Sequence, residues 1–101
     1  MAGEQILAID NGTQSVRALI FDAQGSLIAK KRIPIQPYFS KKSGWAEQDP
    51  DVFWNGVCQA CQGIWAMNGV NKDSVVGVGL TTQRSTVINL DKQHQPLRPA
   101  I

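Results

Sequence analysis

The stretch that decides the fold runs from Ile6 to Asp22 and reads ILAIDNGTQSVRALIFD. It begins with a short apolar run, Ile6 to Ile9, which predicts a strand buried on both faces. Asp10-Asn11-Gly12-Thr13 follows and has the composition of a tight turn. The residues from Val16 to Asp22 then alternate, which predicts a second strand with one apolar face. The stretch therefore predicts an antiparallel pair of strands.

The elements that follow extend this pair. Leu27 to Ile33 predicts a third strand, so the first three strands form an antiparallel meander. After a loop from Pro34 to Gly44, Asp49 and Pro50 mark the start of a helix, which Asn68-Gly69 ends. The apolar residues of this helix recur at three- and four-residue spacing: Phe53, Trp54, Val57, Cys58, Cys61, Ile64 and Trp65.

The last part of the chain predicts a fourth strand from Val75 to Leu80 and a fifth from Ser85 to Leu90, before a turn from Asp91 to Gln95. The link through the helix is long enough to bring the fourth strand parallel to an earlier one. The predicted class is α/β, with a mixed sheet and a helix on one face. If the first strand is buried on both faces, further chain or association must cover the other face.

Composition excludes several classes of protein. A chain of 101 residues predicts one domain, and its net charge of +2 comes without a basic stripe, so we expect no nucleic-acid partner. No apolar run approaches 18 residues and no secretion signal begins the sequence, so we expect no membrane span and a cytoplasmic location.

A first group of polar residues, Asp10 to Ser15, surrounds the predicted turn. Successive backbone N–H groups in such a turn can cradle a phosphate, and the hydroxyls of Thr13 and Ser15 add donors. Asp10 could hold Mg²⁺ through water, and Arg17 could reach the same anion. The alternative is an ordinary hairpin with a polar tip.

A second polar group, Thr81 to Thr86, lies between the last two predicted strands and is longer than a tight hairpin needs. Gln83 and Arg84 could hydrogen-bond to hydroxyl groups of a ligand. Gly77 and Gly79 precede it on one face, which indicates a close approach to that strand. The alternative is an exposed loop.

Other reactive residues favour structural roles. Cys58 and Cys61 have C-x-x-C spacing, but both lie on the apolar side of the predicted helix, so we expect buried structural cysteines rather than a redox or zinc site. Trp45 precedes the helix start, and packing is favoured over a role as a pocket wall. No Ser-His-Asp set can be assembled.

Four stretches together resemble the N-terminal end of the FGGY carbohydrate kinases, and most closely their glycerol-kinase-like branch. They follow the order and spacing of that family along the whole chain: Ile6 to Ala18, Gly44-Trp45-Ala46-Glu47-Gln48-Asp49-Pro50 with Trp54, Val78 to Arg84, and Pro96 to Ile101.

The resemblance implies a ribonuclease H-like, actin-like ATPase fold. It also implies a cleft between two domains, in which the γ-phosphoryl of ATP passes to a sugar or polyol hydroxyl with Mg²⁺ present. Residues 1–101 would then be an incomplete first domain.

The family's site residues can be carried over by position. Asp10 resembles the family's magnesium-associated aspartate, and Arg17 its nucleotide-end arginine. The phosphate hairpin corresponds to Gly12, Thr13, Gln14 and Ser15. Gln83, Arg84 and Ser85 fall in the substrate-binding stretch. Where the glycerol-kinase branch has a glutamate after the arginine, this chain has Ser85, which favours another polyol or sugar over glycerol.

The resemblance places the catalytic base beyond residue 101, so we expect no catalytic residue and no activity in this part alone. A stand-alone, non-catalytic interaction module with an exposed strand edge is the alternative, and self-association through the sheet would then be expected. Another actin-like ATPase would share the Asp-x-Gly-Thr hairpin, but the stretches around Trp45 and Arg84 argue against it.

Overall fold

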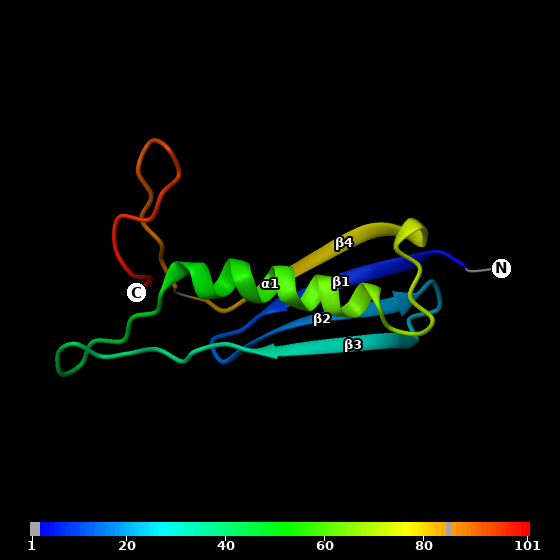
Figure 1. Cartoon of the computed structure of the whole chain (residues 1–101), viewed down its shortest axis with the longest axis horizontal. Coiled ribbons are helices and arrows are strands. Elements are labelled where there is room, and N and C mark those ends of the chain that lie inside the picture. Colours follow the sequence, from blue (N-terminus) through cyan, green and yellow to red (C-terminus); the bar gives the residue numbers. More distant parts are fainter. Residues whose placement is uncertain (1–2, 85) are drawn as a thin grey trace.

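The computed structural model describes residues 3–84 and 86–101 and has one sheet with a helix on one face (Figure 1). The chain first forms three strands, β1 (Gln5–Asn11), β2 (Ser15–Asp22) and β3 (Leu27–Pro34). The helix α1 (Pro50–Trp65) follows after a long loop, and a short 3₁₀ turn, η1 (Lys72–Ser74), leads into β4 (Val75–Thr82).

The sheet is mixed, as the sequence predicts, and its strand order is β3-β2-β1-β4. β2 is antiparallel to both of its neighbours, whereas β4 runs parallel to β1. A parallel neighbour needs a crossover connection, and α1 provides it. The carboxyl ends of β1 and β4 consequently lie side by side at one edge of the molecule.

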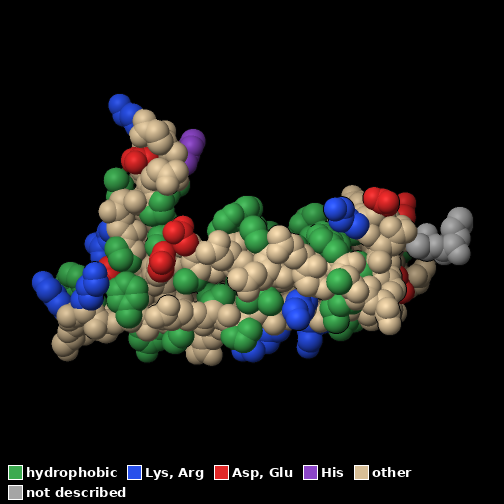
Figure 2. Space-filling model, viewed as in Figure 1, with side chains coloured by type: hydrophobic (Ala, Val, Ile, Leu, Met, Phe, Trp, Pro, Cys, Tyr) green, Lys and Arg blue, Asp and Glu red, His purple; other side chains and the backbone are tan. Residues whose placement is uncertain are grey.

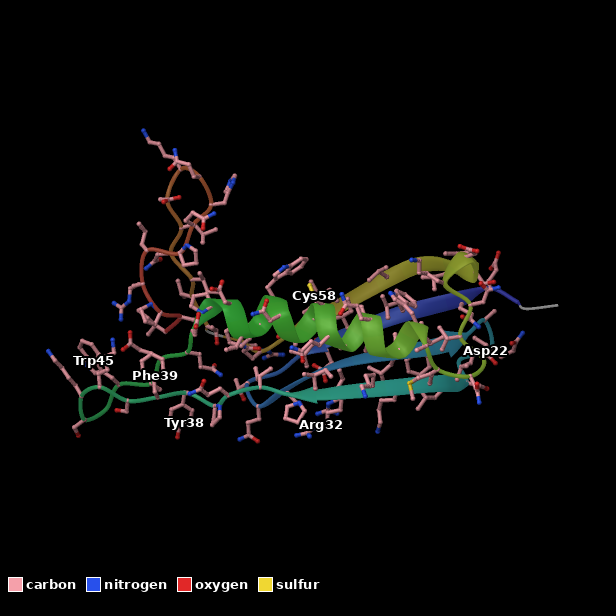
Figure 3. All side chains as sticks on the ribbon, viewed as in Figure 1. Asp22, Arg32, Tyr38, Phe39, Trp45 and Cys58 are labelled. Carbon is pink, nitrogen blue, oxygen red and sulfur yellow. The ribbon has the colours of Figure 1, made fainter. Side chains whose placement is uncertain are left out.

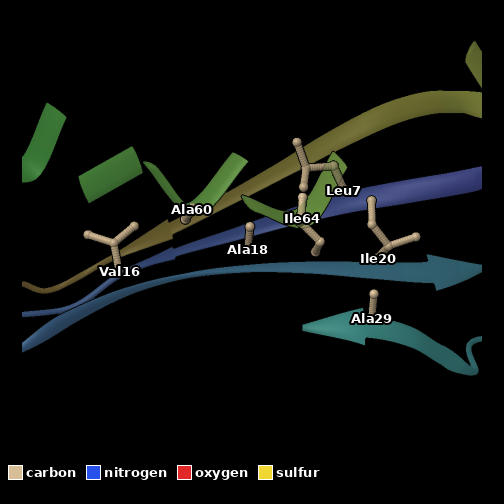
Figure 4. Packing of buried hydrophobic residues seen from close by; sticks show 7 residues of the cluster. All are labelled: Leu7, Val16, Ala18, Ile20, Ala29, Ala60 and Ile64. Carbon is tan, nitrogen blue, oxygen red and sulfur yellow. The ribbon is translucent and has the colours of Figure 1, made fainter. Parts of the chain in front are cut away.

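The core lies between α1 and the sheet, chiefly over β2 and β3 (Figure 4). Val16, Ala18 and Ile20 are completely buried on the same face of β2, which confirms the predicted alternation. The buried cluster is Leu7, Val16, Ala18, Ile20, Ala29, Ala60 and Ile64.

The helix begins where the sequence predicts. The Asp49 side chain accepts a hydrogen bond of 3.0 Å from the Asp51 amide, and Pro50 occupies the first turn. The predicted apolar face is only partly correct, because the buried helical residues are Phe53, Gly56, Ala60 and Ile64, while Trp54 is 68% exposed. At Gly56 the helix lies close to β2: a methyl group added there would lie 2.8 Å from Val16 Cγ2.

The prediction that β1 is buried on both faces is wrong for this structure. Leu7 faces α1 and is 5% exposed, whereas its neighbour Ile6 points to the opposite face and is 43% exposed. An apolar run cannot show whether a second layer is present, because each face is buried only by what packs on it.

The predicted fifth strand is also wrong over the residues that can be assessed, since Ser85 lies outside the described part of the chain. Residues 86–89 form no strand. Val87 instead exchanges two backbone hydrogen bonds of 3.0 Å with Ile101, and Leu90 forms a bridge with Pro96. The predicted turn from Asp91 to Gln95 does form, and it directs this segment back on itself, away from β4 (Figure 1).

Candidate functional site

The first predicted group forms a tight hairpin between β1 and β2. The Gly12 amide donates a 3.0 Å hydrogen bond to the Ser15 carbonyl. A Cβ atom at Gly12 would lie 3.0 Å from the same oxygen, so a side chain here would strain the turn.

Three carbonyl groups of this hairpin accept hydrogen bonds from other segments of the chain. Asn11 O accepts from the Gln83 amide, and Gln14 O accepts from the Ile35 amide, both at 3.0 Å. Thr13 O accepts from Gln48 Nε2 at 2.9 Å. Within the described residues, the N–H groups of Thr13 and Gln14 donate to no protein acceptor. The hairpin thus offers two backbone donors in succession, the arrangement that suits an anion.

Charged and polar side chains line up across the sheet beside the hairpin. Asp10 on β1 is the register partner of Arg17 on β2 and of Thr81 on β4. The Asp10 carboxylate lies 3.9 Å from Arg17 Nε, and both side chains are about half exposed (40% and 48%). An ion pair this exposed contributes little to stability, which leaves both groups free to meet a ligand.

The second predicted group joins the first. Because β4 is parallel to β1, Thr81 and Thr82 lie beside Asp10 and Asn11. The hydrogen bond from the Gln83 amide to Asn11 O continues this contact past the end of the strand. Arg84 follows directly, and Ser85 lies outside the described residues. The structure therefore brings Gln83 to the hairpin that contains the predicted phosphate-binding residues.

A shallow hollow of about 390 Å³ lies beside this line of residues, and Gly79 leaves room for it. A Cβ atom at Gly79 would meet nothing within 4 Å, so no group among the described residues makes the close approach that the sequence predicts. The hollow is lined by Ala8, Ile9, Asp10, Leu19, Phe21, Gly79, Leu80 and Thr81.

Asn11 and Gln48 lie within motifs of the sequence, but those motifs by themselves assign neither residue a role at this site. Asn11 Oδ1 is buried and has no hydrogen-bond partner among the described residues, so its capacity to accept a hydrogen bond is unused there. Gln48 reaches the hairpin from a position 35 residues further along the chain. Neither residue type is distinctive in a sequence, and only the folded chain shows their placement.

The donor set fits a nucleotide phosphate and a magnesium ion bound with it. The described residues contain no cluster of three or more His, Cys, Asp or Glu side chains that could enclose a metal. Mg²⁺ commonly binds through one or two carboxylates together with water and substrate phosphates, so Asp10 alone suffices as a protein ligand.

Trp45 lies in the loop before α1 and Cys58 lies on the helix (Figure 3). Trp45 is at the tip of the loop before α1, is 45% exposed, and has the Lys42 ammonium 4.9 Å from its ring centre. It therefore contacts Lys42 at the surface, and the predicted packing role is not seen in the described residues. Cys58 and Cys61 are half-buried rather than buried, and both are free thiols. Burial and the neighbouring Cys58 raise the pKa of the Cys61 thiol, which keeps it protonated and unreactive near neutral pH.

Comparison with known proteins identifies the family. The model of the N-terminal domain of the FGGY family of carbohydrate kinases matches residues 5–101. This chain belongs to that FGGY family. The line of Asp10, Arg17 and Thr81 therefore lies in a kinase domain of the actin-like ATPase fold, as the resemblance implies.

Curated relatives in the FGGY family are glycerol kinases. The glycerol kinase of Enterococcus casseliflavus is 38% identical over 97 residues, which cover 95% of this chain and 19% of that protein. The glycerol kinase of Lactococcus lactis is 41% identical over 88 residues, which cover 87% of this chain and 18% of that protein. The chain thus spans less than a fifth of the length of these relatives.

Solved structures of FGGY kinases share the fold. A xylulose kinase from Brucella ovis superposes with a TM-score of 0.90 at 26% identity, over 97% of this chain and 20% of that one. Glycerol kinase from Plasmodium falciparum, solved with ADP, gives a TM-score of 0.79 at 29% identity, over 98% of this chain and 20% of that one.

In the described part of the present chain, no helix is both long and apolar enough to cross a membrane.

Proposed function

We propose that the whole protein transfers the γ-phosphoryl group of ATP to a hydroxyl group of a sugar or polyol. The observation that supports this most directly is the hairpin, whose Thr13 and Gln14 N–H groups are available beside Asp10 and Arg17. Membership of a carbohydrate kinase family points to the same chemistry.

The hairpin holds the nucleotide phosphates in this proposal. Gly12 keeps the turn tight, and the N–H groups of Thr13 and Gln14 are the proposed donors. Ser15, which the resemblance also places in the phosphate hairpin, is only 6% exposed and closes the turn through its carbonyl. Arg17 contributes positive charge that offsets the charge on the phosphates. Catalysis of phosphoryl transfer depends mainly on positioning and charge stabilisation, and these groups provide both.

Asp10 is the proposed magnesium-associated residue. When bound, Mg²⁺ would neutralise charge on the transferred phosphoryl group. Asp10, near the carboxyl end of β1, would hold the ion through water molecules.

Gln83, Arg84 and Ser85 are the proposed substrate-binding residues. The backbone amide of Gln83 donates to Asn11 O at 3.0 Å, which supports a role for Gln83 beside the hairpin. Arg84 donates hydrogen bonds to substrate hydroxyls. Ser85 replaces a carboxylate acceptor of the glycerol-kinase branch, so we propose a preferred substrate other than glycerol.

A phosphoryl-transfer screen with the whole protein tests this function. Formation of ADP and of the phosphorylated acceptor is measured for a set of sugars and polyols with excess Mg²⁺. Asp10→Asn should lower kcat by roughly 10²-fold or more, since one charge-stabilising group is removed. Arg84→Ala should raise KM for the acceptor, whereas Lys92→Ala, at an exposed turn, should change neither constant.

Two results would contradict the proposal. If no acceptor is phosphorylated and ATP does not bind, the kinase function is wrong for this protein. A clear preference for glycerol would overturn only the substrate part. Residues 1–101 by themselves should show no turnover, because we propose that the general base comes from chain beyond the first part of the domain.

A stand-alone interaction module is the second candidate, and the exposed β4 supports it. Val76, Val78 and Leu80 are each more than 60% exposed, and hydrophobic side chains reach the surface over α1 and β4 (Figure 2). Apolar groups on an edge strand favour pairing with another chain. For this case we propose that the partner is a second copy of the same chain.

A further inference from the structure

Gln48 links the loop before α1 to the phosphate hairpin. Gln48 is only 7% exposed although its side chain is polar. The side-chain amide nitrogen donates to Thr13 O at 2.9 Å and to Gln36 O at 3.3 Å. A buried amide that contacts two backbone carbonyls from separate segments fixes their relative position.

The backbone of Gln48 is itself held on both sides. Its amide donates to Ala100 O at 3.0 Å, and the Ala100 amide donates back to Gln48 O at 2.7 Å. The next residue, Asp49, caps α1. Gln48 is thus a rigid support and not a mobile side chain that happens to touch the hairpin.

The contact with Thr13 O determines where a neighbouring N–H group points. The carbonyl of Thr13 and the amide of Gln14 belong to one trans peptide unit, so they point in opposite directions. Because Gln48 holds the carbonyl towards the protein, the Gln14 N–H is directed away from it. That N–H is one of the two donors without a protein acceptor among the described residues.

We propose that Gln48 is a positioning residue for nucleotide binding, which orients the peptide between Thr13 and Gln14 so that its N–H faces the phosphates. This inference rests on the proposed kinase function, and it concerns a residue that does not itself touch the nucleotide. The bond from the Ile35 amide to Gln14 O orients the next peptide in the same manner, so Gln48 completes an anchored turn.

The test uses the whole protein with Gln48→Met, which keeps the side-chain length but removes the donor. Gln62→Met, at an exposed position on α1, is the matched control. Amide hydrogen exchange without nucleotide is measured at Gly12 and Ile35, whose amides close the hairpin. Binding of ADP and of a non-hydrolysable ATP analogue with Mg²⁺ is measured by calorimetry.

We expect local and selective effects from Gln48→Met. Exchange at Gly12 and Ile35 should accelerate, while the distant turn closed by the Gly25 amide stays unchanged. Nucleotide affinity should fall roughly five- to tenfold, the effect of losing one hydrogen bond. KM for ATP should rise by a similar factor with KM for the acceptor unchanged, and Gln62→Met should match the parent protein.

Two outcomes would overturn the inference: unchanged exchange and affinity, or acceleration at all amides alike, which indicates a general structural role. If the parent protein binds no nucleotide but exchange accelerates only at the hairpin, the kinase function fails and the hairpin support stands. If Gln48→Met does not fold, Gln48→Asn provides the same readouts, because its shorter amide cannot reach both carbonyls.

Discussion

Glu47 and Arg98 form an ion pair of 2.6 Å although 51 residues separate them in the sequence. The Glu47 side chain is 4% exposed, whereas that of Arg98 is 41% exposed. The pair lies next to the backbone bridge between Gln48 and Ala100, so it fastens the last residues of the chain to the segment that supports the hairpin. A buried carboxylate with a single charged partner makes that partner important for stability.

Removing the partner should therefore be costly. Arg98→Met leaves Glu47 buried without its cation, and we expect the free energy of unfolding to fall by about 1–3 kcal/mol. Urea denaturation measures the loss. Glu47→Gln is the control, since an amide tolerates burial better and should lose less; an equal or larger loss would contradict the argument.

Gln5, at the opposite end of the sheet, should be as important for stability as Arg98. It is 4% exposed, donates to Gly69 O at 2.9 Å and accepts from the Asn71 amide at 3.0 Å. Gln5→Leu leaves both backbone groups unpaired, so we expect a loss of roughly 2–3 kcal/mol in thermal or urea unfolding. Gln24→Leu, in an exposed turn, should change stability by less than about 0.5 kcal/mol.

Two glycines of α1 provide a matched pair. A methyl group at Gly56 would lie 2.8 Å from Val16 Cγ2 in the core, whereas one at Gly63 would meet only the flexible Lys31 side chain. Gly56→Ala should destabilise the fold by about 1–3 kcal/mol through overpacking. Gly63→Ala should be neutral or stabilise by up to about 1 kcal/mol through helix propensity. The same sign for both variants in urea unfolding would refute the packing argument.

Alkaline pH should weaken the contribution of Cys61 to the stability of the folded chain. Burial and the neighbouring Cys58 raise the pKa of this thiol above its ordinary value of 9.0. The folded state therefore favours the protonated form, and this stabilisation is present below pH 9.0 and lost as the pH rises through the raised pKa. As the pH rises from 8 to 11, the free energy of unfolding of the parent chain, measured in urea, should fall relative to that of Cys61→Ala. A constant difference would contradict this.

Residues 1–101 should self-associate through β4. Val78 is 62% exposed on an edge strand, so pairing with a second copy removes apolar surface from water. Val78→Lys should shift the mass in analytical ultracentrifugation towards that of a monomer. Val87→Lys, at a 52% exposed position outside the sheet, is the control. A monomer mass at every concentration of the parent chain would disprove the association.

Much of the candidate site was predictable, because its residues follow predictable elements. The hairpin from Asp10 to Ser15 follows from turn residues between two apolar strands, and the polar stretch after β4 follows from its composition. Their contact through Gln83 required the parallel register of β4 beside β1. Gln48 and Asn11 could not be recognised, because their roles come from hydrogen bonds, or the lack of them, that form only on folding.

The sequence by itself determined the order and type of the four strands and the helix, since periodicity, turn residues and the cap at Asp49 are local signals. It also determined the family through its motifs. The tertiary structure decided which helical residues are buried: Gly56 lies so close to Val16 that an added Cβ atom would be 2.8 Å from Val16 Cγ2, whereas Trp54 is 68% exposed. It likewise decided that Arg98 and Ala100 contact Glu47 and Gln48 and that residues 86–89 do not extend the sheet, because pairing between segments distant in sequence depends on where the rest of the chain has placed them.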